Sequence, residues 1–150
     1  FGAAYAAFMD ARAFTPSARP PVRFVDGEAE AYAATRAREA HDFWHVLFAC
    51  PTTVAGELAL KAVEFVQTGL PSAGAAVVGA AWRLDPTGRA WLAGTALPWA
   101  LRSGSRAADL MTLDYEGALP EDLEVVRARW RITPLRGEGP PPKAAVKRKK

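Results

Sequence analysis

The chain comprises 150 residues, of which 50% are hydrophobic, and this is enough for one globular domain with a buried core. Its formal net charge of +3 is concentrated in residues 143–150, which carry five basic residues and no acidic one. The rest is slightly acidic, which excludes a broad basic nucleic-acid surface. The lack of an apolar run of about 18 residues excludes a transmembrane helix within these residues, and the single cysteine, Cys50, excludes a disulfide within them.

Periodicity and capping signals predict an all-α fold. We expect a single helical domain over residues 1–135 and a disordered basic tail over residues 136–150, because the tail is rich in proline, glycine and charge. The predicted helices cover, in chain order, residues 2–14, 28–49, 52–68, 72–84, 89–101, 110–117 and 121–130.

Particular residues mark the ends of the earlier helices. Asp26 is predicted to cap the helix over residues 28–49, and Thr52 or Thr53 the next helix, because their side-chain oxygens can accept hydrogen bonds from free N–H groups. Gly69 followed by Pro71 is the usual sequence at a helix C-terminus.

Proline residues mark further boundaries. Residues 16–21 are expected to form an extended linker, because they contain three prolines. A turn is predicted over residues 85–88, and Pro98 is expected to kink the helix around it. Pro120 is predicted to occupy the first position of the last helix.

Both histidines of the chain lie one turn apart in the helix predicted over residues 28–49. Successive residues of an α-helix advance by about 100° and ~1.5 Å, so His45 lies about 40° around the axis from His41, and Asp42 about 100°. Three side chains that can bind a metal therefore share one side of a helix. Asp42 has the largest offset, and it could instead act as a base beside the metal.

Glu57 is expected to face these residues from the next helix. Pro51 marks the turn, with His45 six residues before it and Glu57 six residues after it, so the two are at the same height in a regular antiparallel hairpin. Two imidazoles and two carboxylates suit zinc or another divalent ion. The sequence thus predicts a metal site formed by His41, Asp42, His45 and Glu57.

A simpler interpretation treats the two acidic residues as surface charges. Asp42 would then pair with Arg38, and Glu57 with Lys61, each at a spacing of four residues along a helix.

Arg38 and Glu64 lie on the same sides of the two helices, farther from the turn. Each is thirteen residues from Pro51, so they are predicted to form an ion pair across the hairpin. Alternatively, Arg38 holds an anionic group of a substrate near the metal, because a guanidinium group matches a carboxylate. The two roles are compatible.

The spacing of the metal ligands belongs to a longer pattern. Residues 41–57 read HDxxH, eleven residues and then Glu, and VQTGLP follows at residues 66–71. The closing segment DLEVVRARWRITP extends the likeness to about Pro134. The pattern resembles the ubiquinone (coenzyme Q) biosynthesis protein 4 family.

The resemblance implies a metal-dependent decarboxylase, a carbon–carbon lyase acting on 4-hydroxy-3-methoxy-5-polyprenylbenzoate in ubiquinone biosynthesis. Asp42 or Glu57 is the candidate proton relay, and a redox-active metal would favour an oxidative decarboxylation. The resemblance also implies a peripheral protein on the matrix side of the mitochondrial inner membrane, in a complex with other ubiquinone biosynthesis enzymes. The alternative is a non-catalytic, lipid-binding scaffold for that complex, with a structural metal.

Two apolar segments have a packing and a lipid interpretation. Residues 72–84 contain no large side chain before Trp82, which favours close helix packing, or alternatively a groove for a polyprenyl tail. Trp91 and Trp99 share one side of a helix, where packing is expected and contact with a membrane surface is the alternative. Most of the five tryptophans are expected in the core.

Overall fold

The computed structural model describes residues 1–15, 22–137 and 139, and within them it confirms the all-α class, with no strand. The helices are α1 (Gly2–Asp10), α2 (Glu28–Phe48), α3 (Val54–Thr68), α4 (Pro71–Ala80), the 3-10 helix η2 (Ala81–Arg83), α5 (Pro86–Trp91), the π-helix η3 (Leu92–Ala96), α6 (Leu97–Arg106), α7 (Tyr115–Ala118) and α8 (Leu123–Arg129). None of these described helices is long and apolar enough to cross a membrane. The predicted linker over residues 16–21 and most of the predicted tail lie outside the described residues.

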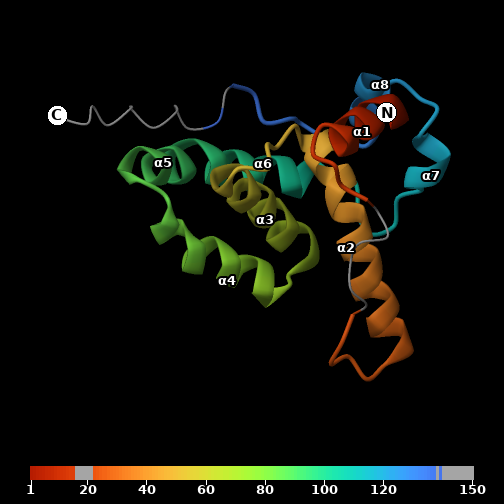
Figure 1. Cartoon of the computed structure of the whole chain (residues 1–150), viewed down its shortest axis with the longest axis horizontal. Coiled ribbons are helices and arrows are strands. Elements are labelled where there is room, and N and C mark those ends of the chain that lie inside the picture. The colour runs from red at the N-terminus through yellow and green to blue at the C-terminus, as the bar shows by residue number, and fades with distance from the viewer. Residues whose placement is uncertain (16–21, 138, 140–150) are drawn as a thin grey trace.

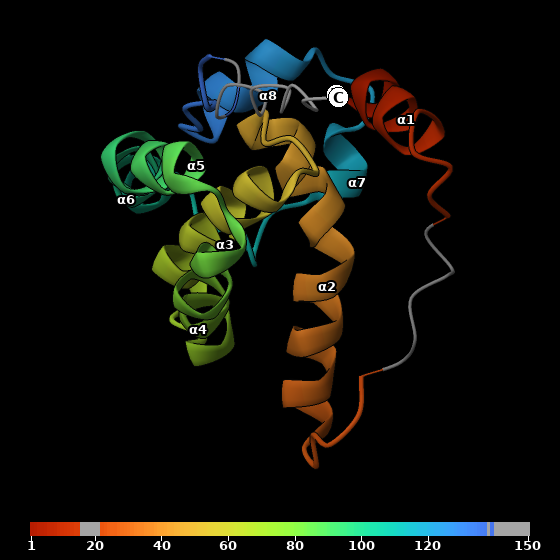
Figure 2. The same cartoon turned by 60° about the vertical axis from the view of Figure 1, so that its left-hand side comes forward.

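The helices are arranged around α2, whose N-terminal half extends beyond the other helices in both views (Figures 1 and 2). On one side of α2, α3 packs against both α4 and α6. Near the C-terminal end of α2, Figure 1 shows α1, α7 and α8 gathered together. The half of α2 that carries both histidines is therefore the half enclosed by other helices.

The core forms because α3 has a regular apolar stripe. Its buried residues Ala55, Leu58, Ala59, Ala62 and Val63 recur at spacings of three and four, which places them on one side of the helix. Leu58, Ala59, Ala62 and Val63 belong to a single core cluster whose most deeply buried members come from helices and loops along most of the chain. Those members are Leu47, Phe48, Ala59, Leu60, Val63, Ala96, Ala100, Leu110, Tyr115 and Val126.

The end of α2 is set by a left-handed residue. Ala49 has a φ of 53°, and the N–H of Cys50 donates to the carbonyl of His45 at 3.0 Å. This is the closing bond of a Schellman motif, which usually has glycine at the left-handed position. The motif reverses the chain immediately after the histidines.

The start of α3 confirms the predicted cap. The Thr53 side chain accepts a hydrogen bond from the N–H of Gly56 at 3.2 Å. At the other end, Gly69 is left-handed with a φ of 67°, and Pro71 opens the next helix, as the Gly–Pro pattern predicts.

Three predicted boundaries are wrong. The N-cap of α2 is Gly27 rather than Asp26, and its backbone is extended with no side-chain cap. Residues 85–88 are not an isolated turn, because the Asp85 side chain caps α5 by accepting from Gly88. The last helix begins after Asp122, whose carboxylate accepts from the N–H groups of Glu124 and Val125, so Pro120 lies outside it.

Two predicted helices are shorter than expected. The first ends at Asp10, and residues 110–117 contain only the single turn α7. Before that turn, the Asp109 carboxylate accepts from the N–H of Met111, a side-chain-to-backbone bond that competes with helix formation. By contrast, the helical segment predicted over residues 89–101 is longer than expected, and it consists of α5, η3 and α6 in succession. The π-helix directly before Leu97 and Pro98 accommodates the proline that was expected to cause a kink.

The tryptophans are in part core residues. Trp44, Trp99 and Trp130 are buried, and the Trp44 Nε1–H donates to the Tyr115 hydroxyl at 2.7 Å. Trp99 donates to the carbonyl of Thr133 at 3.0 Å, so it packs inside rather than facing outward. Trp91 packs against the core and Trp82 is 74% exposed, so the expectation that most of the five tryptophans lie in the core is confirmed.

Candidate metal centre

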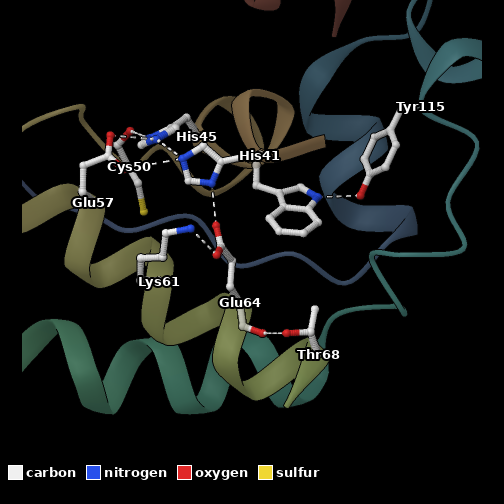
Figure 3. Close-up of polar contacts among 9 residues, drawn as sticks. His41, His45, Cys50, Glu57, Lys61, Glu64, Thr68 and Tyr115 are labelled. Carbon is white, nitrogen blue, oxygen red and sulfur yellow. Dashed lines mark hydrogen bonds and ion pairs between the residues drawn. The ribbon is translucent and has the colours of Figure 1, made fainter. Parts of the chain in front are cut away.

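Three side chains from two helices converge beside the α2–α3 turn (Figure 3). The Nε2 atoms of His41 and His45 are 3.1 Å apart. The Glu57 carboxylate, from the first turn of α3, places Oε1 3.1 Å from Nε2 of His45 and Oε2 3.5 Å from Nε2 of His41. The structure thus brings together three of the four predicted ligands, with one donor atom of each within 4.8 Å of the others.

The His45 ring is held in one tautomer by the backbone. Its Nδ1 lies 2.9 Å from the carbonyl oxygen of Cys50. Because a carbonyl oxygen only accepts, Nδ1 carries the hydrogen, and the neutral ring presents the Nε2 lone pair to the cluster. The carbonyl is positioned by the Schellman motif at the end of α2, so the turn between the helices also orients the imidazole.

The His41 ring is oriented by a carboxylate. Its Nδ1 lies 2.5 Å from Oε1 of Glu64, and Oε2 of Glu64 lies 2.5 Å from the Nζ of Lys61 (Figure 3). Glu64 therefore accepts from Nδ1 and leaves the Nε2 lone pair of His41 directed at His45 and Glu57. A carboxylate behind a ligating histidine is the usual outer partner in metal sites.

The charges in the cluster favour a cation at its centre. Burial alone would raise the pKa of Glu57 and lower that of His41. When a proton occupies the centre of the cluster, the hydrogen bonds between Glu57 and the two histidines outweigh the effect of burial. The pKa of Glu57 is held below its usual value, and the pKa of His41 is raised by hydrogen bonds to Glu57 and Glu64. The carboxylates are thus ionised, and a positive charge, either a proton or a metal ion, is stabilised between them.

The distances are compatible with a bound metal ion as well as with a shared proton. Two nitrogens bound to one tetrahedral zinc ion at ~2.0–2.1 Å would be about 3.3 Å apart, and the two Nε2 atoms here are 3.1 Å apart. Two lone pairs that face each other at this distance repel unless a cation lies between them. The residues present therefore fit a divalent ion.

Asp42 is not among the three grouped side chains. Its side chain is buried on α2 beside His41, and its offset around the helix is the reason that the sequence made it the least certain ligand. Its role as a fourth ligand, or as a base beside the metal, stays a prediction.

The predicted ion pair between Arg38 and Glu64 is wrong. Among the residues that the structure describes, Glu64 forms ion pairs with His41 and Lys61. The two helices diverge with distance from the loop that joins them (Figures 1 and 2). Glu64 therefore contacts His41, which lies one helical turn closer to that loop than Arg38 does. The ion pair between Glu57 and Lys61 that the simpler interpretation requires is not formed either, because Lys61 pairs with Glu64.

Several contributors to the site were missed by sequence analysis. The Cys50 carbonyl carries no sequence signal of its own, although its position just after a helix end is typical of a C-terminal motif. Arg127 of α8 donates to the carbonyls of Val46 and Leu47 at 2.8 Å each, which adds side-chain hydrogen bonds to the last turn of α2. Cys50 itself is buried, and burial raises the pKa of its thiol to about 12, which fits the predicted packing role.

Replacing Glu64 with glutamine should weaken metal binding without removing it. The amide oxygen can still accept from His41, but the negative charge that makes the imidazole a stronger ligand is lost. We expect a ~10- to 100-fold decrease in zinc affinity, the range found for such outer partners, measured by competition with a chromogenic chelator. An unchanged affinity would show that the contact between Glu64 and His41 does not support the metal.

The fold and the site define a class: an all-helical protein with a candidate divalent-metal site of two histidines and a glutamate in a helix hairpin. Residues 1–136 match the family described as coenzyme Q (ubiquinone) biosynthesis protein Coq4, and the chain belongs to that family.

Relatives from distant organisms agree with this assignment. The chain is 40% identical over 136 residues to a protein of Aedes aegypti named ubiquinone biosynthesis protein COQ4 homolog, mitochondrial, covering 91% of this chain and 50% of that protein. It is 39% identical over 141 residues to the protein of the same name from Bos taurus, and the match covers 93% of this chain and 53% of that protein. The identity to the Coprinopsis cinerea relative is 39% over 132 residues, and the match covers 88% of this chain and 45% of that protein. The chain thus spans about half the length of these relatives.

Proposed function

We propose that this chain carries the metal centre of a decarboxylase that acts on a prenylated 4-hydroxybenzoate in ubiquinone biosynthesis. The observation that carries the proposal is the convergence of His41, His45 and Glu57, with both imidazoles oriented by other partners. Membership of the Coq4 family supports the pathway.

A divalent ion would be held by Nε2 of His41, Nε2 of His45 and a Glu57 oxygen. Zinc is our first choice, because nitrogen and carboxylate donors suit it. Three protein ligands with one open position are typical of catalytic zinc, whereas a closed set of four is typical of structural zinc. If Asp42 joins the set, it must therefore be displaceable by substrate or water.

The ion, when bound, would supply a positive charge that polarises a substrate oxygen. Loss of CO₂ breaks the bond between the ring and its carboxyl carbon, and the ring carbon then takes a proton. Glu57 is one candidate to relay that proton when it is not bound to the ion, because its side chain is 38% exposed and can reach solvent. Asp42 is the second candidate for this role. In an oxidative decarboxylation the ring carbon would instead receive an oxygen atom from a two-electron oxidant of the peroxide class, with CO₂ and water as the other products.

We also propose a location and partners. The names of the Aedes and Bos relatives include the word mitochondrial, and this supports a mitochondrial protein. The polyprenyl tail of the substrate requires access to a membrane, so we place the protein on the matrix side of the inner membrane, bound peripherally and in a complex with other ubiquinone biosynthesis enzymes.

A specific observation favours the alternative, a non-catalytic lipid-binding scaffold. A groove of about 490 Å³ between α3, α4 and α6 is lined almost entirely by apolar side chains, among them Phe65, Val78 and Leu101. These three are 46%, 80% and 58% exposed. Such a surface could hold a polyprenyl chain without any chemistry at the metal centre.

The two functions are separated by assaying CO₂ release from the carboxyl-labelled prenylated acid. Zinc- and iron-loaded protein should release CO₂, and the variants His45→Ala and Glu57→Ala should lose at least ~99% of the rate if the ion is required. Analysis of the ring carbon distinguishes protonation from hydroxylation. Folded, metal-free variants that match the parent rate would contradict metal catalysis, and no release from any form would favour the scaffold.

A further inference from the structure

Beside the metal centre lies a cleft of about 640 Å³. Its walls come from α2, which contributes Arg38 and His41, from α3, which contributes Lys61 and Glu64, and from the start of α4. His41 is thus shared between the metal centre and the cleft. A molecule bound in the cleft would lie against His41, one of the three candidate ligands.

The cleft has a surplus of positive charge. Glu64 is its acidic residue, and its two oxygens are already engaged by His41 and Lys61. Arg38 lies on the opposite wall, and its side chain forms no hydrogen bond or ion pair with any residue in the described part of the chain. The exposed Arg23 adds a further positive charge at the rim. The charge of Arg38 is therefore available to a ligand.

The remaining lining suits an aromatic ring. Ala34 and Ala37 precede Arg38 on α2, and Leu70 and Ala73 face them from the start of α4. These side chains are small or apolar. A ligand with an anionic group on a flat apolar body would match both parts of the cleft.

We propose that Arg38 binds the carboxylate of the aromatic acid and holds its carboxyl-bearing carbon beside the metal centre. Arg38 precedes His41 by one helical turn, about 4.5 Å along the axis. Its planar guanidinium can donate two parallel hydrogen bonds to a carboxylate. The inference rests on the proposed function for its choice of substrate, and it assigns to this one residue the recognition of the acid.

The test compares an acid with its ester. The probe is 4-hydroxy-3-methoxybenzoate with a single isoprene unit at position 5, titrated calorimetrically into the zinc-loaded protein, alongside its methyl ester. Arg38→Gln should weaken binding of the acid by about 10- to 100-fold, the range of a charge-assisted pair, and should leave ester binding and zinc content unchanged.

The matched control is Arg102→Gln. Arg102 is exposed on α6 and does not line the cleft, so its variant removes the same charge elsewhere and should bind acid and ester like the parent. Equal weakening of acid and ester in Arg38→Gln, or no weakening of the acid, would overturn the assignment. Displacement of the acid by an equal concentration of inorganic phosphate would show a general anion site and would also overturn it.

Failure of this inference is distinguishable from failure of the proposed function. Acid binding that depends on Arg38 in a protein that releases no CO₂ supports the carboxylate site and contradicts the decarboxylase. CO₂ release whose KM does not change in Arg38→Gln contradicts the carboxylate site and leaves the decarboxylase standing. A binding residue of this kind should raise KM more than it lowers kcat.

Discussion

Replacing His45 with asparagine is expected to lower zinc affinity on the order of 10²- to 10³-fold. Structural zinc sites bind with ~10–16 kcal/mol, so each of about four ligands contributes ~2.5–4 kcal/mol, and 1.36 kcal/mol corresponds to a factor of about ten. The loss should be near the upper end, because the His45 side chain is 1% exposed and water cannot easily replace it as a ligand.

Competition with a chelator measures this affinity, and circular dichroism checks that the helices remain. Glu39→Gln is a suitable control, because Glu39 is exposed on the same helix and is not one of the grouped ligands. The control should bind zinc like the parent. A folded His45→Asn protein with parental affinity would mean that the hairpin is not where the metal binds.

Replacing Gly56 with alanine should destabilise the protein and impair the metal centre together. An added Cβ would lie 2.0 Å from the carbonyl oxygen of Pro51 and 2.7 Å from its Cγ, so α3 must move away from the turn. We expect a loss of about 2–3 kcal/mol in the free energy of unfolding, as for other overpacked sites. Glu57, the next residue, would move away from His45, and zinc affinity should fall with the stability.

The direction of the expected change in the free energy of unfolding separates the effect of the close contact from the effect of helix propensity. Alanine is a better helix former than glycine by ~1 kcal/mol, so propensity alone predicts stabilisation. Gly79 on α4 is the matched control, because a Cβ there would meet nothing within 4 Å, and Gly79→Ala should stabilise the protein by up to ~1 kcal/mol. Urea unfolding of the two variants measures both effects. A stabilised Gly56→Ala protein would contradict the close contact between α3 and the turn.

The parts of the site that the sequence predicts are those set by local geometry. His41 and His45 are one helical turn apart whatever the rest of the chain does. Glu57 is close to them because the turn between α2 and α3 is short. Thr53 caps α3 through its own hydroxyl, and Gly69 ends α3 through its left-handed backbone. For these residues, helix periodicity and capping rules were sufficient.

The parts that could not be predicted depend on how helices pack. The pairing of Glu64 with His41 rather than Arg38 follows from the divergence of α2 and α3, and no spacing along the chain encodes that angle. The contacts of Arg127 with the end of α2 join residues about 80 positions apart, at 2.8 Å each. The left-handed Ala49 occupies a position where the sequence offers no glycine, so its role was also hidden.

The most direct test of the account is a crystal structure of the zinc-loaded protein with anomalous diffraction data collected on both sides of the zinc absorption edge. We expect a single anomalous peak at ~2.0–2.2 Å from Nε2 of His41, Nε2 of His45 and an oxygen of Glu57. A peak that lies elsewhere, or a fully loaded protein with no peak between these three side chains, would contradict it.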